Sequence, residues 1–294
     1  MSQVLMAKSE AAVPSDVSTV VQYALAEDIG DGDRNAALVA TNTSARARVI
    51  ARENAILAGA PWFDAVFAAL NPAVTVRWSC ADGQRLRADA TVVELEGPVH
   101  ALLSGERTAL NFLQLLSGVA SATHEYVERV KGTDTAIIDT RKTLPGLRSA
   151  QKYAVLCGGG VNHRFGLFDA ILIKENHIMA AGSIDAAVAR AREQSPALFL
   201  QVEVENLTEL EQALEAGVDG VLLDNLATHV LARAVNMADA HRRRFRRDIV
   251  IEASGDISLT NVREIADTGV DRISIGGLTK HVRATDFSMR MYTE

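Results

Sequence analysis

The sequence predicts a mixed unit of strands and helices in residues 1–131, followed by a β/α barrel in residues 132–281. Two observations support this fold class. Strands and helices alternate without regular order in the first part, as in an α+β unit. After Gly132, short apolar runs recur every twenty to thirty-five residues or so, most of them followed by a helical pattern, as repeated β/α units require. The chain is 48% hydrophobic, so it can bury a large core.

The first part contains both kinds of element. Pro61 suits the first turn of a helix, and residues 105–120 place Leu110, Leu113 and Leu116 on one apolar side of a strong amphipathic helix that runs on to Lys131. Residues 45–52 alternate small or apolar residues with arginines, which indicates a half-exposed strand. The predicted helices are 17–27, 61–70 and 105–131, and the predicted strands are 45–52, 74–78 and 91–96.

The second part repeats one pattern. Gly217 and Gly269 come just after two of its helices, where a residue with left-handed backbone is common. Six units fit an open doubly wound sheet or a barrel, but no G-x-G-x-x-G follows a first strand, which favours the barrel. The apolar runs are 136–138, 170–173, 198–204, 220–223, 249–251 and 272–275, and the helices are 184–194, 207–216, 228–243 and 259–268.

Charge and cysteine content exclude several classes of protein. The net charge of -7 argues against nucleic-acid binding, and we assign the basic run at residues 241–247 to a solvated helix end. Cys80 and Cys157 show no metal-binding spacing, so neither a disulfide framework nor a zinc site is expected. No stretch reaches the ~20 apolar residues of a membrane span, and the first seventeen residues do not resemble a signal peptide. We expect a cytoplasmic protein without membrane contact.

Polar or charged residues follow almost every apolar run. In a β/α barrel the carboxyl ends of the strands meet at one mouth, where catalysis takes place. An acidic protein that binds an anion must concentrate its positive charge in such a pocket. The sequence therefore predicts a site for a strongly anionic, phosphate-bearing substrate. The strand-end groups are 139–142, 174–177, Glu203 with Glu205, 224–225, 252–255 and 276–277.

The cations at these ends differ in chemistry. Arg141 and Arg164 can each grip a carboxylate or phosphate with a bidentate fork. Lys142 and Lys174 are compact charges suited to phosphate oxygens. His163 stands beside Arg164 and just after three glycines, which favours a role in the site over a purely structural one.

The carboxylates and glycines leave alternatives open. Glu203 and Asp224 lie one strand apart and could hold ribose hydroxyls, hold a magnesium ion or act as a general base. A buried salt bridge to Lys174 would be their purely structural role. The last two strand exits, at Ser254–Gly255 and Ile275–Gly277, suit phosphate binding by backbone N–H groups.

Several strings resemble one family. D-T-R-K-T-L-P-G-L-R at 139–148 and K-E-N-H at 174–177 are the most specific. Together with G-E-R-T-A-L-N at 105–111, N-H-R at 162–164, E-V-E at 203–205, L-D-N at 223–225, E-A-S-G at 252–255 and L-T-K-H-V-R-A at 278–284, they are similar to quinolinate phosphoribosyltransferase, the carboxylating nicotinate-nucleotide pyrophosphorylase.

The resemblance implies a fold and a reaction. The fold is an N-terminal α/β sandwich in residues 1–131, on which the tail 282–294 packs back, followed by an incomplete, six- or seven-stranded β/α barrel in residues 132–281. Quinolinate and 5-phosphoribosyl 1-pyrophosphate would give nicotinate mononucleotide, pyrophosphate and CO₂ with Mg²⁺, a step of de novo NAD biosynthesis. The assembly would be a homodimer, or a hexamer, with active sites shared between subunits.

The resemblance also assigns residues, matched motif by motif. Arg141, His163, Arg164 and Lys174 would hold the pyridine dicarboxylate, joined by Arg107 of the neighbouring subunit. The phosphoribosyl part and its metal would fall to Thr140, Lys142, Glu203, Asp224, Ser254, Gly255, Asp256, Ile275, Gly276 and Gly277. Lys142, Lys174, Glu203 and Asp224 would be catalytic, and Glu203 and Asp224 would hold the metal. Asp256 stands where the family commonly has a second glycine.

Three other hypotheses remain at this stage. A nicotinate-type phosphoribosyltransferase would use the decarboxylated substrate. A sugar-phosphate isomerase or aldolase would need either a lysine that forms a Schiff base, for which Lys174 is the candidate, or an acid/base pair. A non-catalytic regulator would bind a phosphorylated metabolite and use the basic run at 242–247 for DNA, which the acidic chain disfavours.

Overall fold

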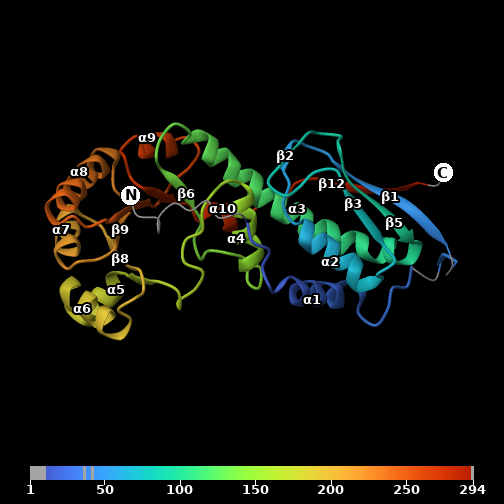
Figure 1. Cartoon of the computed structure of the whole chain (residues 1–294), viewed down its shortest axis with the longest axis horizontal. Helices are drawn as coiled ribbons and strands as arrows, with labels where there is room; N and C mark the ends of the chain where they lie inside the picture. The colour runs from blue at the N-terminus through green and yellow to red at the C-terminus, as the bar shows by residue number, and fades with distance from the viewer. Residues whose placement is uncertain (1–10, 36–37, 41–42, 293–294) are drawn as a thin grey trace. The chain divides into compact units, whose positions relative to one another are not determined.

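The structure is a computed structural model that describes residues 11–35, 38–40 and 43–292. These residues form two compact units (Figure 1). The barrel unit comprises residues 125–142 and 160–276, and the N-terminal unit comprises the described residues up to 124 together with 143–159 and 277–292. The units are thus interleaved in sequence, and the simpler predicted boundaries, 1–131 and 132–281, stay a prediction.

The N-terminal unit is built on an antiparallel sheet of order β12-β1-β5-β3. In β1 the buried residues Ala47, Val49 and Ala51 alternate with exposed arginines, as a strand with one covered face requires. The tail strand β12 pairs with β1 from Phe287 opposite Ala51 to Tyr292 opposite Arg46. The strands are β1 (Ser44–Ala51), β3 (Thr75–Trp78), β5 (Thr91–Pro98) and β12 (Phe287–Tyr292), with a small separate pair, β2 (Ala55–Ile56) and β4 (Arg85–Leu86).

The helices of this unit pack on each other and on the sheet. The long helix α3 starts at Val99, six residues before the predicted Gly105, and continues past Gly118. A side chain at Gly118 would meet the carbonyl oxygen of Arg283, which explains the glycine. Asp82 accepts hydrogen bonds from the backbone N–H groups of Gly59 and Ala60, and so satisfies donors at the start of α2. The helices are α1 (Val17–Ile29), α2 (Ala60–Leu70), α3 (Val99–Arg129), α4 (Arg148–Cys157) and the short α10 (Gly277–Lys280).

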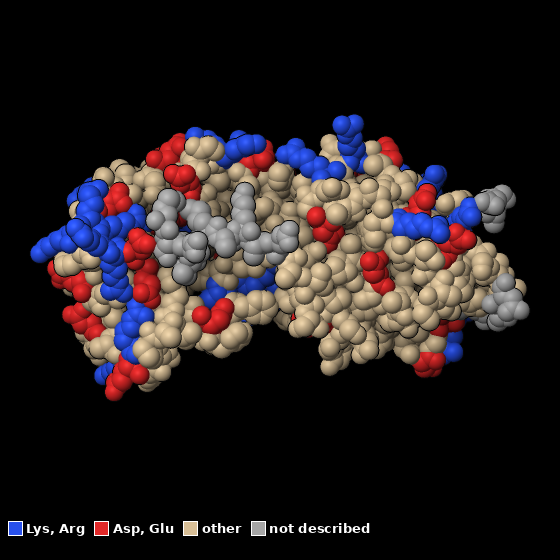
Figure 2. All heavy atoms as spheres, in the orientation of Figure 1, with Lys and Arg blue, Asp and Glu red and all other residues tan. Residues whose placement is uncertain are grey.

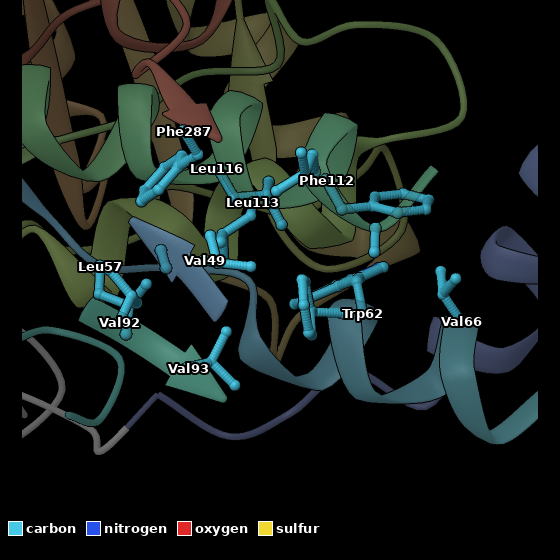
Figure 3. Close-up of a cluster of buried hydrophobic side chains, with 14 of the residues drawn as sticks. Val49, Leu57, Trp62, Val66, Val92, Val93, Phe112, Leu113, Leu116 and Phe287 are labelled. Carbon is cyan, nitrogen blue, oxygen red and sulfur yellow. The ribbon is translucent and has the colours of Figure 1, made fainter. Parts of the chain in front are cut away.

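The core of the N-terminal unit is apolar (Figure 3). Trp62 of α2 and Leu113 and Leu116 of α3 are completely buried there. The rings of Phe63 and Phe67 lie 5.1 Å apart, centroid to centroid, in a tilted arrangement that aromatic pairs prefer. Burial of apolar surface therefore holds this unit together.

The barrel unit contains a six-stranded parallel sheet of order β6-β11-β10-β9-β8-β7. The last strand, β11, pairs with the first, β6, from Arg272 opposite Ala136 to Ser274 opposite Ile138. This closure identifies a barrel, because an open doubly wound sheet does not bring its first and last strands together. No ladder joins β6 to β7 within the described residues, so the barrel is incomplete, and the predicted fold class is confirmed. The strands are β6 (Ala136–Ile138), β7 (Ile171–Ile173), β8 (Leu200–Val204), β9 (Gly220–Asp224), β10 (Val250–Ser254) and β11 (Arg272–Ser274).

Capping side chains and glycines mark where helices between these strands begin and end. Ser183 and Asn206 accept hydrogen bonds from Ala186 and Glu209 and cap α6 and α7. Gly217 and Gly269 have positive φ of 79° and 88° just after their helices, as predicted. The helices are α5 (Glu175–Ala181), α6 (Ile184–Gln194), α7 (Leu207–Glu215), α8 (Thr228–Phe245) and α9 (Val262–Ala266).

The basic run at residues 241–247 closes α8, and basic side chains gather over this helix with acidic ones among them (Figure 2). Two of its arginines form ion pairs with aspartates of the barrel unit. Arg242 pairs with Asp271 (2.5 Å) and Arg247 with Asp219 (3.1 Å), and both aspartates stand just before strands. These pairs lie at the amino ends of the strands, opposite the predicted site. None of the helices in the described part of the chain has the length and apolar character of a membrane span.

Candidate active site

The structure places the predicted site residues of the barrel unit where strands end. Thr140, Arg141 and Lys142 follow β6, and Lys174 follows β7 as the residue that caps α5. Glu203 lies within β8, one residue before its end, while Asp224 and Ser254 are the last residues of β9 and β10. Ile275 and Gly276 come directly after β11. Because the six strands are parallel and adjacent, these side chains share the carboxyl end of the sheet.

Lys174 and Glu203 form the closest ion pair of the site. The Lys174 ammonium lies 2.6 Å from Glu203 Oε2, and Glu203 is largely shielded, with 18% of its side chain exposed. The Lys174 side chain is 47% exposed, so it remains accessible from solvent. This is the pair that the sequence left open as a structural role, and it also preorganises both groups for a ligand.

Arg141 and Arg164 come close enough for their charges to interact. Burial lowers the pKa of the Arg164 guanidinium, and the positive charge of Arg141 lowers it further, while Asp169 opposes this. Arg164 is also oriented, because its Nη1 donates to the carbonyl of Ala170 (3.1 Å). Two guanidinium groups in one place make a site for an anion with two negative groups.

His163 is held by the barrel interior. Its Nε2 lies 3.4 Å from Oε2 of Glu252, and its Nδ1 accepts a hydrogen bond from the backbone N–H of Arg164 (2.6 Å). Asp139, completely buried after β6, accepts from the backbone N–H of His163 (2.8 Å) and from the Asn162 amide (2.6 Å). The structure thus binds the N-H-R segment to the ends of β6 and β10.

Another part of the rim consists of lysine, hydroxyl and glycine groups. Gly276 leaves room for Lys142, because a Cβ there would lie 2.8 Å from Lys142 Cδ. Thr140 Oγ1 accepts a hydrogen bond from the backbone N–H of Lys142 (3.0 Å).

The β9 and β10 ends are also joined. Ser254 pairs with Asp224 in the ladder, and the Ser254 carbonyl accepts from the N–H of Asn225 (2.9 Å). Gly255 has φ of +94°, and any side chain there would collide with Asn225. Asp256, which stands where a second glycine is common in the family, is exposed and also has positive φ.

The metal assignment can be tested against the donor set. Among the residues that the structure describes, no group of three or more His, Cys, Asp or Glu side chains is arranged to hold a metal ion. Glu203 and Asp224 together supply two carboxylates, of which Glu203 is bound to Lys174. Mg²⁺ is commonly bound by one or two carboxylates together with substrate phosphates. The residues therefore fit a metal that arrives with a phosphate ligand, and do not form a complete protein cage.

Sequence reasoning missed a group of buried polar residues below the rim. Gln201, Glu252 and Arg272 are linked by hydrogen bonds inside the barrel unit. A signal was present, because side chains two apart in a strand share one face. Gln201 is two residues before Glu203, and Glu252 is two residues before Ser254.

A cavity of about 570 Å³ lies beside this site, next to α5 and α6. Glu203 lines it together with other acids, among them Glu175, Asp185, Glu205 and Glu209. Such a lining repels anions, so the predicted anion site stays at the cations of the strand ends and is not moved to this cavity.

Arg107 and Gly277 belong to the N-terminal unit. Arg107 is exposed on α3, and Gly277 is the first residue of α10. Their assignment to the site stays a prediction.

The comparisons with known proteins agree with this geometry. The model of the quinolinate phosphoribosyl transferase C-terminal domain matches residues 119–290, and that of the N-terminal domain matches residues 33–117. The chain is 40% identical to a probable nicotinate-nucleotide pyrophosphorylase (carboxylating) of Synechocystis, over 92% of this chain and 91% of that protein. It is 38% identical to the human nicotinate-nucleotide pyrophosphorylase (carboxylating), over 96% and 93%.

A solved structure gives the same result. The nicotinate-nucleotide pyrophosphorylase from Francisella tularensis superposes with a TM-score of 0.91 at 43% identity, covering 96% of this chain and 98% of that one. The two family models together match most of the chain and the relatives cover nearly its full length, so the chain belongs to the quinolinate phosphoribosyltransferase family.

Proposed function

We propose that this chain transfers the phosphoribosyl group of 5-phosphoribosyl 1-pyrophosphate to quinolinate with loss of CO₂, giving nicotinate mononucleotide and pyrophosphate for NAD biosynthesis. The observation that carries the proposal is the gathering of arginines and lysines at the strand ends of an acidic barrel. The substrates bring two carboxylates, a phosphate and a pyrophosphate, which such a mouth would bind.

Quinolinate would lie by Arg141 and Arg164, with Lys174 and His163 beside it. The positive charges of these two guanidinium groups repel each other, and a ligand with two carboxylates would offset this repulsion. Arg164 is already held in position, because its Nη1 donates to the Ala170 carbonyl and its backbone N–H donates to His163 Nδ1. The preference for a dicarboxylate over nicotinate, which has one carboxylate, would arise here.

The phosphoribosyl group would lie over Thr140, Lys142, Asp224, Ser254, Gly255, Ile275 and Gly276, with Asp256 and Gly277 at its margin. The ring nitrogen of quinolinate forms a bond to the ribose C1 while the bond from C1 to the pyrophosphate oxygen breaks. Positive charge develops on the ribose, and the carboxylate of Glu203 or Asp224 would stabilise it. The bond between the ring carbon next to this nitrogen and its carboxylate carbon then breaks. CO₂ leaves, and the same ring carbon takes up a proton.

Glu203 and Asp224 would hold Mg²⁺ together with the pyrophosphate. The metal would neutralise charge on the leaving group. Lys142 and Lys174 would add positive charge on the same side.

The reaction is tested by assaying purified protein with quinolinate, 5-phosphoribosyl 1-pyrophosphate and Mg²⁺. Pyrophosphate release with quinolinate, and none when nicotinate replaces it, is the expected result. Release with nicotinate alone would show the decarboxylated-substrate activity instead. Trapping of Lys174 by borohydride with a keto-sugar phosphate would revive the isomerase or aldolase hypothesis.

The active form would be a homodimer, or a hexamer, in which Arg107 reaches the quinolinate subsite of the neighbouring subunit. Its exposure on α3 leaves it accessible for such a role. Arg107→Ala and Lys174→Ala should each be inactive and should regain activity when mixed, because one intact site forms in the hybrid. Failure to regain activity across a range of mixing ratios would place Arg107 in its own subunit's site or outside it.

A further inference from the structure

A polar layer lies in the barrel interior, one step below the rim of the site. It consists of Gln201, Glu252 and Arg272, from β8, β10 and β11. Gln201 Nε2 and Arg272 Nε both donate to Glu252 Oε2, at 2.9 and 2.8 Å, and Arg272 Nη2 donates to Gln201 Oε1 at 3.2 Å. Gln201 and Glu252 are 1% and 0% exposed, so water does not compete for these bonds.

Glu252 stays charged in this layer. Burial by itself would raise its pKa, but the charge of Arg272 and the contacts with His163 and Gln201 outweigh burial and lower the pKa to about 2. Its second oxygen, Oε1, is buried without a hydrogen-bond partner in the structure. The unpartnered oxygen carries a desolvation cost, so the contacts made by Oε2 carry the whole stabilisation of this carboxylate.

The layer is connected to the quinolinate subsite through His163. Oε2 of Glu252, which accepts from Gln201 and Arg272, also lies 3.4 Å from His163 Nε2. On the other side of the ring, Nδ1 accepts from the backbone N–H of Arg164. A nitrogen that accepts cannot carry the proton, so the ring proton belongs on Nε2, facing Glu252.

We propose that Glu252 is a positioning residue: held by Arg272 and Gln201, it fixes the orientation and tautomer of His163, and through His163 it fixes Arg164 for the dicarboxylate substrate. The inference rests on the proposed function for the identity of that substrate. Glu252 itself does not touch the substrate. A displaced Arg164 would weaken binding of quinolinate and leave the phosphoribosyl subsite intact.

Two substitutions at one position separate contact from charge. Glu252→Asp keeps the charge opposite Arg272 but withdraws the carboxylate by one methylene from His163. Glu252→Gln loses the charge but keeps an oxygen that can accept the same bonds. Ser274→Ala, a buried change two residues after Arg272 in β11, is the matched control.

Glu252→Asp should raise the KM for quinolinate about tenfold, since small misplacements of a substrate-binding group have effects of this order or larger. The KM for 5-phosphoribosyl 1-pyrophosphate should change by less than about twofold, and Glu252→Gln and Ser274→Ala should keep the KM for quinolinate within about threefold of wild type. A KM for quinolinate in Glu252→Asp within about twofold of wild type would overturn the proposal. An equal loss in Glu252→Gln would overturn it too, because the contact would then not be the cause.

A spectroscopic readout tests the link without activity. In ¹⁵N-histidine-labelled protein, with the His163 signals identified by their loss in His163→Asn, Nε2 should appear protonated and Nδ1 unprotonated. Glu252→Asp should shift these signals, and Ser274→Ala should not. An unchanged tautomer in Glu252→Asp would contradict the proposal. If wild-type protein with this signature releases no pyrophosphate from quinolinate, the proposed function fails while the Glu252–His163 link stands.

Discussion

Both units have apolar cores, and they differ in the polar groups that are buried near the strand ends. The N-terminal unit buries tryptophan, phenylalanine and leucine between its helices and its antiparallel sheet (Figure 3). The barrel unit buries Gln201, Glu252 and Asp139 and connects them to Arg272 and His163. Apolar contacts stabilise a core but do not depend on the direction of a bond. The hydrogen bonds and ion pairs of a charged layer do, and they fix side chains in one orientation. From this contrast we expect the N-terminal unit to act as a scaffold and the charged layer of the barrel unit to place the proposed catalytic groups.

Asp82 of the N-terminal unit is a half-buried carboxylate and Glu252 of the barrel unit a completely buried one, and their pKa values move in opposite directions. Burial raises the pKa of Asp82 in the N-terminal unit, although hydrogen bonds from Gly59, Tyr153 and Ala60 oppose it. For Glu252, Arg272 supplies a full positive charge and the pKa falls. A carboxylate that only caps a helix is left with the cost of burial, while the one below the active site is kept ionised by a cation.

The largest expected effect is on activity, at the rim of the barrel. Lys174→Ala removes the cation that holds Glu203 at 2.6 Å, and kcat/KM for quinolinate should fall by about 10²–10³. Lys131→Ala is the matched control, because it also removes a lysine paired with a glutamate, Glu128 at 3.7 Å, but away from the strand ends. Steady-state assays of both variants should show a loss only in Lys174→Ala. Equal activities would end the assignment of the rim as the site.

The next effect is on stability, in the apolar core. Leu113→Ala leaves a cavity beside Trp62 and α2 and should lower the free energy of unfolding by about 2–5 kcal/mol. Leu103→Ala, on the exposed side of the same helix, should change it by less than about 0.5 kcal/mol. Urea unfolding measures both, and kcat/KM per folded molecule should stay at the wild-type value. A lower kcat/KM in folded Leu113→Ala would show that the two interiors are not separate in function.

Acidification should reveal the charge on Glu252. The pKa is about 2 in the folded chain and 4.5 ordinarily, so the stabilisation is present above 4.5 and is lost as the pH falls toward 2. Between pH 5 and pH 3 the stability advantage of wild type over Glu252→Gln should shrink by on the order of 2 kcal/mol. Urea unfolding at the two pH values gives this difference. An advantage that does not depend on pH would mean that Glu252 is not charged in the folded chain.

The smallest effect has the opposite sign and belongs to Asp82. Its pKa in the folded chain lies above the ordinary 3.8, so the folded chain takes up this proton first as the pH falls. Wild type should therefore gain stability relative to Asp82→Asn on acidification, until the unfolded carboxyl is protonated below 3.8. The gain is small because three hydrogen-bond donors favour the charged form. Thermal melts of both proteins between pH 7 and pH 4 would detect it, and a loss of stability in place of a gain would reverse the assignment.

Much of the fold could be predicted because periodicity reports burial. The six apolar runs became β6 to β11, since buried parallel strands are short and apolar. Among the described residues the helices α4, α5 and the short α10 were not predicted, and for α4 and α5 the reason is physical. α5 has no buried residue and thus no apolar stripe, and α4 buries Gln151 and Lys152, whose polarity hides its inner face. The pairing of β11 with β6 could not be predicted from residue spacing, which carries no information on strand order.

The strand-end position of the predicted site residues could be deduced from the sequence, and the polar layer beneath them could not. Lys174 and Glu203 attract attention because charges follow apolar runs, and the structure joins them. Glu252 was predicted as a strand-end group of the mouth, whereas it lies inside β10, and Arg272 was predicted only as the start of a strand. Their partnership depends on the register of β10 against β11, in which Glu252 pairs with Arg272. The sequence alone does not reveal this register, so it cannot reveal the pairing of Glu252 with Arg272.

The central claim is that the charged strand ends perform the chemistry and the apolar unit supports them. The most direct test compares kcat/KM for quinolinate with the free energy of unfolding in Lys174→Ala and Leu113→Ala, measured side by side. The account predicts that Lys174→Ala loses activity and keeps its stability, and that Leu113→Ala loses stability and keeps its activity when folded. An active Lys174→Ala, or a folded but inactive Leu113→Ala, would contradict it.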